Sequence, residues 1–155
     1  MSQTSVSINQ LTARAGLLYD SHSAKTIRSK IAEGAVTFGR ALVLGTDKDR
    51  QVKGTTTDTD TFAGVVVHDH ARESNPAVTN AEIADEGSVA AIELGPIWVE
   101  VFEAVTPGDA VAVSVAAGAN NMKFGLTTGA NFITVAGAKW LSTTAGAGLA
   151  VLSLG

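Results

Sequence analysis

The chain contains no cysteine, which excludes a disulfide framework, a thiolate nucleophile and a cysteine-ligated metal. It also lacks any apolar run near the roughly 20 residues that a membrane-spanning helix needs, so no membrane association is expected. The first residues do not contain the apolar core of a secretory signal peptide. We therefore expect a protein that is made and kept soluble.

Large side chains and charges are both scarce. Aromatic residues make up 5% of the 155 residues, while Gly, Ala, Val and Thr are abundant, so the core is expected to consist of small, β-branched side chains. Charged residues make up 17%, against roughly 25% in an average soluble domain. A single domain of this length has few charges with which to cover its surface. This shortage indicates that other subunits cover part of it.

The charges that are present are unevenly distributed. Residues 1–53 carry eight basic and four acidic side chains, residues 54–110 carry one basic and eleven acidic ones, and residues 111–155 carry only two lysines. The net charge of −4 therefore combines a basic first third with an acidic middle.

Four cations of the basic third are candidate contact residues: Arg14, Lys25, Arg28 and Lys30. Acidic residues interrupt them and no aromatic residues lie between them, which disfavours nucleic-acid binding. An acidic protein partner is the better expectation.

The clearest strand pattern lies between Gly95 and Val115. Ile97, Val99 and Val101 alternate with larger or charged residues, and a second alternating run, 111–115, follows a Pro107-Gly108 turn. Many short strands with turn signals every 8–12 residues predict an all-β fold, either a small β-barrel or a jelly-roll-like β-sandwich. The Gly95-Pro96 pair is expected to break the strand that begins near Val89.

The domain organisation expected from this pattern is an extended, polar N-terminal arm (1–30) and a single β-domain (31–155). Val36 to Leu42 resembles Val105 to Val111, and similar echoes occur further along. One interpretation of the β-domain is two related β-units, 31–67 and 88–155. Chance recurrence of small residues explains the echo about as well.

No catalytic residue and no cofactor are predicted, because no nucleophile elbow, phosphate-binding loop or dinucleotide fingerprint occurs. His68 and His70 have a spacing that metal sites use, yet solvent-facing histidines at a strand end are the better interpretation. Asp58 and Asp60 are interpreted as a solvated turn, so no metal site is predicted either.

Trp98 and Trp140 are the only tryptophans. Core packing explains each of them, and the alternative is that they are anchors at a subunit or capsid contact.

Six segments, taken together and in order, resemble the structural cement (capsid decoration) proteins of tailed bacteriophages. They are Ala15-Gly16-Leu17-Leu18-Tyr19-Asp20, Ala35-Val36-Thr37-Phe38-Gly39, Phe62-Ala63-Gly64-Val65-Val66-Val67, Gly95-Pro96-Ile97-Trp98-Val99-Glu100-Val101, Val105-Thr106-Pro107-Gly108-Asp109-Ala110-Val111, and the ending 145–152. No single segment is specific, because each is a strand or turn signature.

The resemblance implies a non-enzymatic virion protein on the outer surface of the capsid. Such proteins clamp adjacent major capsid protein subunits and stabilise the expanded head, as homotrimers more often than dimers. The family supplies no motif of contact residues, so the contact residues Arg14, Lys25, Arg28, Lys30, Trp98 and Trp140 are inferred from this chain alone.

Two other functions stay open at the level of the sequence. A carbohydrate- or cell-surface-binding β-module would use Trp98 or Trp140 as a stacking platform. A metal-dependent β-barrel enzyme would need His68 and His70 to hold a metal ion.

Overall fold

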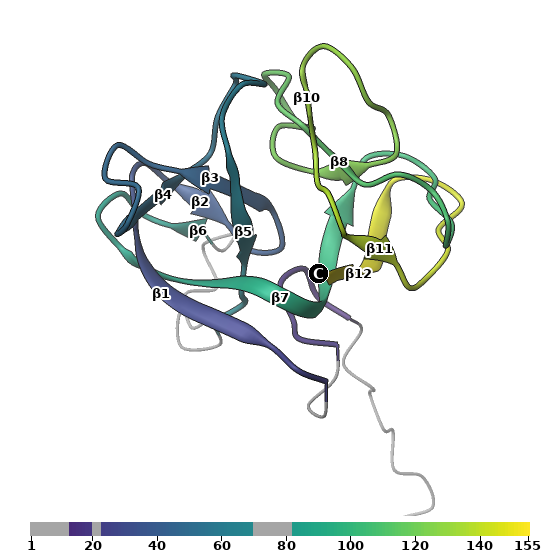
Figure 1. Cartoon of the computed structure of the whole chain (residues 1–155), viewed down its shortest axis with the longest axis horizontal. Helices are drawn as coiled ribbons and strands as arrows, with labels where there is room; N and C mark the ends of the chain where they lie inside the picture. The colour runs from purple at the N-terminus through teal and green to yellow at the C-terminus, as the bar shows by residue number, and fades with distance from the viewer. Residues whose placement is uncertain (1–12, 20–22, 70–81) are drawn as a thin grey trace, which may run out of the picture.

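The computed structural model describes residues 13–19, 23–69 and 82–155 of the chain (Figure 1). These residues form strands, turns and loops, and no helix occurs among them. The strands are β1 (Thr26–Ala32), β2 (Val36–Thr37), β3 (Ala41–Leu44), β4 (Gln51–Lys53), β5 (Phe62–Val66), β6 (Glu82–Ile83), β7 (Ser88–Val101), β8 (Ala112–Ser114), β9 (Phe124–Gly125), β10 (Phe132–Thr134), β11 (Lys139–Trp140) and β12 (Gly148–Leu154).

Five strands close into a small barrel. The order β1–β4–β3–β5–β7 is completed by pairing of β1 with β7, so the last strand returns to the first. The two-stranded β2–β6 sheet lies beside it (Figure 1). The prediction of an all-β fold with a small barrel is therefore confirmed.

The long strand β7 connects the barrel to the second half of the molecule. Its first half pairs with β1 and β5, whereas residues 95–101 pair along their whole length with β12. Strands β8, β9 and β10 continue from the end of β7, and β11 adds to β12. In Figure 1, β7 runs across the molecule from beside β1 to the sheet of β12.

Two buried clusters fill the two halves. The smaller one lies in the barrel and includes Leu42, Val52 and Val66. The larger one surrounds Phe124 and Trp140 in the second half. Strands β3, β5 and β7 contribute side chains to both clusters, so the two halves share strands that are buried on both faces.

The predicted alternation of β7 is confirmed, but the predicted break at Gly95-Pro96 is wrong. Ile97, Val99 and Val101 all lie in the larger cluster, and β7 continues without interruption through Gly95. Ile92 lies in the same cluster although it is five positions from Ile97, an odd spacing that a strict period of two does not allow. The alternation is reset at a β-bulge, where Thr26 and Ile27 of β1 pair with Leu94 and Ile92 and leave Glu93 as the extra residue, and the strand continues through Gly95.

The turn at Pro107-Gly108 is confirmed. The Asp109 amide donates to the Thr106 carbonyl over 3.1 Å, and Gly108 has a φ of 104°, as a type II turn requires. Val111, Val113 and Val115 then point into the larger cluster, as predicted.

Residues 26–30, assigned to the N-terminal arm by the sequence pattern, form most of β1 and thus part of the barrel wall. Their polar composition reflects the outward side of that wall. Of the rest of the predicted arm, residues 13–19 and 23–25 are described, and residues 1–12 and 20–22 lie outside the described residues. The relationship between the two proposed β-units stays a prediction.

Candidate functional site

Strand β1 presents an apolar and cationic surface. Ile27, Ser29 and Ile31 lie on one face of the strand, and both isoleucines are 42% exposed. Leu94 of β7 is also exposed, and because it pairs with Thr26 it lies on the strand face of Arg28 and Lys30. We call residues 27–31 together with Leu94, which include both faces of the strand, the β1 face.

The two predicted cations of β1 are held at this surface by short contacts. Arg28 Nε lies 2.9 Å from Glu93 Oε2, and the Arg28 side chain is 63% exposed. Lys30 Nζ donates to the Asp49 carbonyl over 2.7 Å. Both positive charges lie at even positions of β1 and therefore on the strand face opposite to the exposed isoleucines, and these contacts do not bury them.

The other two predicted cations lie on either side of β7. Lys25 precedes β1 and is partly buried, with its stem packed close to Gly95. Arg14 is exposed and belongs to residues 13–19, which lie along the opposite edge of β7. The structure therefore brings Lys25, Arg28 and Lys30 to one strand, while Arg14 is separate from them.

Residues 13–19 are held against β7 by backbone hydrogen bonds. Gly16 N donates to Trp98 O over 2.7 Å, Trp98 N donates to Leu17 O over 2.9 Å, and Tyr19 N donates to Pro96 O over 3.3 Å. On its other side the segment accepts a bond from His68 N at Gly16 O. It thus fills the gap between the end of β5 and the edge of β7.

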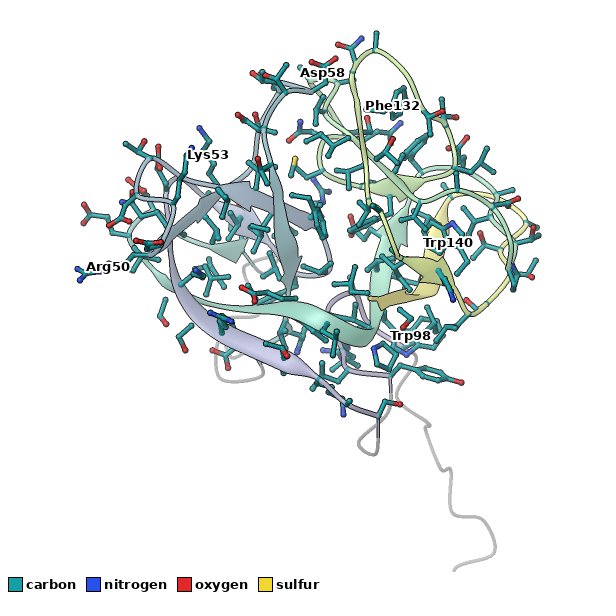
Figure 2. The ribbon with its side chains drawn as sticks, in the orientation of Figure 1. Arg50, Lys53, Asp58, Trp98, Phe132 and Trp140 are labelled. Carbon is teal, nitrogen blue, oxygen red and sulfur yellow. The ribbon has the colours of Figure 1, made fainter. Side chains whose placement is uncertain are left out.

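The two predicted tryptophans lie on opposite faces of the β7–β12–β11 sheet (Figure 2). Trp98 is partly exposed, and Tyr19 packs edge-on against it with 6.0 Å between ring centroids. Trp140 is only 2% exposed, and its indole Nε1 donates to the Ala110 carbonyl over 3.1 Å.

The prediction that Trp140 forms a capsid or subunit contact is therefore corrected. Its ring is an anchor of the larger core cluster, because the adjoining strands cover it completely. The same burial removes Trp140 as a stacking platform for a sugar, and only Trp98 retains an accessible ring edge.

A group of charged residues that the sequence did not reveal joins the two halves. Arg40, just before β3, places Nε 2.9 Å from Glu100 Oε2 and donates from Nη1 to the Asn121 carbonyl. Lys123 Nζ lies 3.9 Å from the same Glu100 oxygen. These residues are far apart in sequence, and the sequence pattern singled out none of them as a contact.

The carboxylates that could suggest a metal site make hydrogen bonds within loops. Asp60 accepts from the Thr55 hydroxyl, and Asp58 accepts from the Asn131 amide. Across the ranges that the structure describes, no group of three His, Asp or Glu side chains is placed to share a metal ion. His70, one of the two histidines with metal-site spacing, lies outside those ranges.

Glu33 carries the clearest electrostatic perturbation. The Thr46 amide and hydroxyl both donate to its carboxylate, over 2.6 and 2.9 Å. These hydrogen bonds stabilise the charged form and lower the pKa of Glu33 below its ordinary value. Because they tie the turn between β3 and β4 to the end of β1, their role is structural.

The fold matches that of a chain in the solved capsid of Myoviridae phage XM1. The TM-score is 0.77 over 96% of this chain and 94% of the other, at 16% sequence identity. A second solved structure, the head fibre gp8.5 N base of bacteriophage phi29, has a TM-score of 0.48 at 12% identity, covering 85% of this chain and 95% of that one. No curated protein sequence matches the chain.

The architecture is thus one that occurs in a phage capsid. The model of one family, described as "Structural cement protein (E217 gp24/Pam3 gp6)", matches residues 2–155. The chain belongs to this family, and membership assigns it a structural role in the phage capsid as a component of the virion. No helix that could cross a membrane occurs in the described part of the chain.

Proposed function

We propose that this protein binds the outer surface of the capsid and clamps adjacent major capsid protein subunits, so that the expanded head is stabilised. It acts without catalysis or a cofactor, and it binds as a homo-oligomer, a trimer in preference to a dimer. Family membership over residues 2–155 supports a capsid role. We infer that the β1 face is the surface that contacts the capsid.

The β1 face supports this proposal because it combines exposed apolar area with positive charge on a rigid strand. Ile27 and Ile31 are too exposed to contribute fully to the protein's own core. Arg28 and Lys30 alternate with them along the same strand, with their side chains on its other face. A surface of this kind fits an acidic protein partner that also offers apolar side chains.

The expected strength of each contact is modest. Complete burial of an isoleucine contributes about 1.5–3 kcal/mol, so burying the exposed 42% of each side chain contributes about 0.6–1.3 kcal/mol. Two isoleucines per protomer then supply about 1–2.5 kcal/mol. In an oligomer the second and third contacts are effectively intramolecular, so several weak contacts together form a tight clamp.

The proposal is tested with expanded capsid shells assembled without this protein. We expect wild-type protein to sediment with the shells. The double variant Ile27→Thr/Ile31→Thr, which keeps β-branched side chains in β1, should bind about 5- to 50-fold more weakly per protomer. The matched control is Leu126→Thr, which alters a residue 37% exposed outside the β1 face.

Undiminished binding of a folded double variant would show that the β1 face does not contact the capsid. Light scattering behind a sizing column measures the oligomer independently, and a trimer has about three times the 15.8 kDa mass of the chain.

A further inference from the structure

A groove on the outer side of the β7–β12 sheet is separate from the β1 face. Its volume is about 540 Å³, and it lies between residues 13–15 on one side and residues 147–149 on the other. Glu100 and Val101 of β7, together with Lys123, complete the lining. The groove therefore crosses β7 where the strand pairs with the beginning of β12.

Positive charge exceeds negative charge in and beside this groove. Glu100 is the only described carboxylate among its lining residues, and Arg40 already binds that carboxylate at 2.9 Å from the barrel side. Lys123 is 3.9 Å from the same oxygen, too far for a short hydrogen bond, and its side chain is 22% exposed. Arg14 lies on the opposite side of the groove.

Arg40 and Lys123 thus share one carboxylate and Arg14 lies across the groove, on a protein whose net charge is −4. In partly desolvated surroundings such an excess favours an anionic occupant. Lys123 is the residue best placed to bind an anionic occupant, because its ammonium group lies farther from the Glu100 carboxylate than the Arg40 guanidinium does.

The groove continues onto an apolar surface. Trp98 is two positions before Glu100 on β7, so both side chains lie on the same face of the strand, roughly 7 Å apart along it. Trp98 pairs with Val151 of β12, and Tyr19 packs against the Trp98 ring. An extended segment bound along β7 would contact the cations of the groove with one residue. The residue two positions away in the same segment would contact the indole ring of Trp98.

We infer that this groove binds an extended acidic segment of the capsid subunit, in which a carboxylate and an apolar side chain are two positions apart. The inference rests on the proposed capsid function and adds to it a second contact of different chemistry. The carboxylate would bind Lys123, and the apolar side chain would pack on Trp98. Two separate contacts per protomer are what a clamp between neighbouring subunits requires.

The test compares Lys123→Gln and Lys123→Glu with Lys139→Glu, using the same shells assembled without the protein. Lys139 lies on β11, is exposed, and does not line the groove, so it controls for the loss of a positive charge. We expect Lys123→Gln to weaken shell binding about fivefold and Lys123→Glu more strongly, with little effect of Lys139→Glu. Wild-type binding should also fall with added salt, and the fall should be smaller for Lys123→Gln.

The outcomes separate this inference from the proposed function. If wild-type protein binds the shells and folded Lys123→Gln and Lys123→Glu bind equally well, the groove inference is wrong while the capsid function stands. If wild-type protein does not bind the shells at all, the capsid function itself is wrong. If Lys123→Glu instead breaks a wild-type oligomer into monomers, the groove holds a second copy of the chain, and the capsid segment is the wrong occupant.

Discussion

Replacing Gly39 by alanine is expected to release residues 13–19 from the edge of β7. Gly39 has a φ of 71°, and a Cβ placed on it would contact Ala15 Cβ and come within 2.6 Å of Gly16 N. Because Gly16 N is a backbone atom, rotation of a side chain cannot relieve the contact. Either the backbone around Gly39 or the segment itself must move.

The size of the effect follows from the backbone conformation. A non-glycine residue held at positive φ costs about 1–3 kcal/mol, and the steric contact with Gly16 adds to that cost. Detaching the segment removes the steric contact and lets the backbone at residue 39 relax away from positive φ, but it breaks the segment's hydrogen bonds to Trp98 and Pro96. The strain in the docked state therefore shifts the local opening equilibrium by about 5- to 150-fold towards the detached state.

Limited trypsin digestion measures this opening, because Arg14 lies within the segment. When opening is fast relative to cleavage, the cleavage rate follows the population of the open form. Cleavage after Arg14 should therefore accelerate by about 5- to 150-fold in Gly39→Ala. The matched control is Gly146→Ala, at a position without positive φ where an added Cβ meets no atom within 4 Å.

Equal cleavage rates in Gly39→Ala and wild-type protein, at unchanged thermal stability, would refute this account of the segment.

The remaining predictions concern the core and a surface turn. Trp140→Ala should lower the free energy of unfolding by about 3–5 kcal/mol in urea titrations, whereas Trp98→Ala should cost much less, and equal costs would contradict the assignment of Trp140 to the core. Hydrogen bonds from Thr46 lower the pKa of Glu33 in the folded protein. The charged carboxylate therefore stabilises the fold fully above the unfolded-state pKa, near 4.5. This contribution is lost as the pH falls through the lower, folded-state pKa. Glu33→Gln should therefore be less stable than wild type at pH 7, and the difference should shrink on acidification. A difference that is constant with pH would show that the charge is not responsible.

Local sequence patterns predicted the strands well where local physics decides them. The alternation in Ile97–Val101 and the Pro107-Gly108 turn depend on side-chain period and backbone preference, both of which are visible in a short window. Gly95-Pro96 misled the prediction because such a pair usually ends a strand, whereas β7 continues through it and the alternation is reset at the bulge at Glu93, which no local pattern marks.

The surface was harder to predict, because it depends on contacts between distant residues. Residues 26–30 are polar enough to be assigned to an arm, yet their pairing with β7 makes them part of the barrel wall. Trp140 is buried by the other residues of the larger cluster, which come from strands far apart in the sequence. The contact of Arg40 with Glu100 spans sixty positions, and no periodic pattern indicates a pairing at that separation.

The measurement that tests the central claim most directly is the heat resistance of expanded shells with and without this protein. Shells saturated with wild-type protein should bind a fixed number of copies and lose their integrity at a higher temperature than bare shells. Failure to bind, or binding that leaves the disruption temperature unchanged, would contradict the proposal that this protein cements the head.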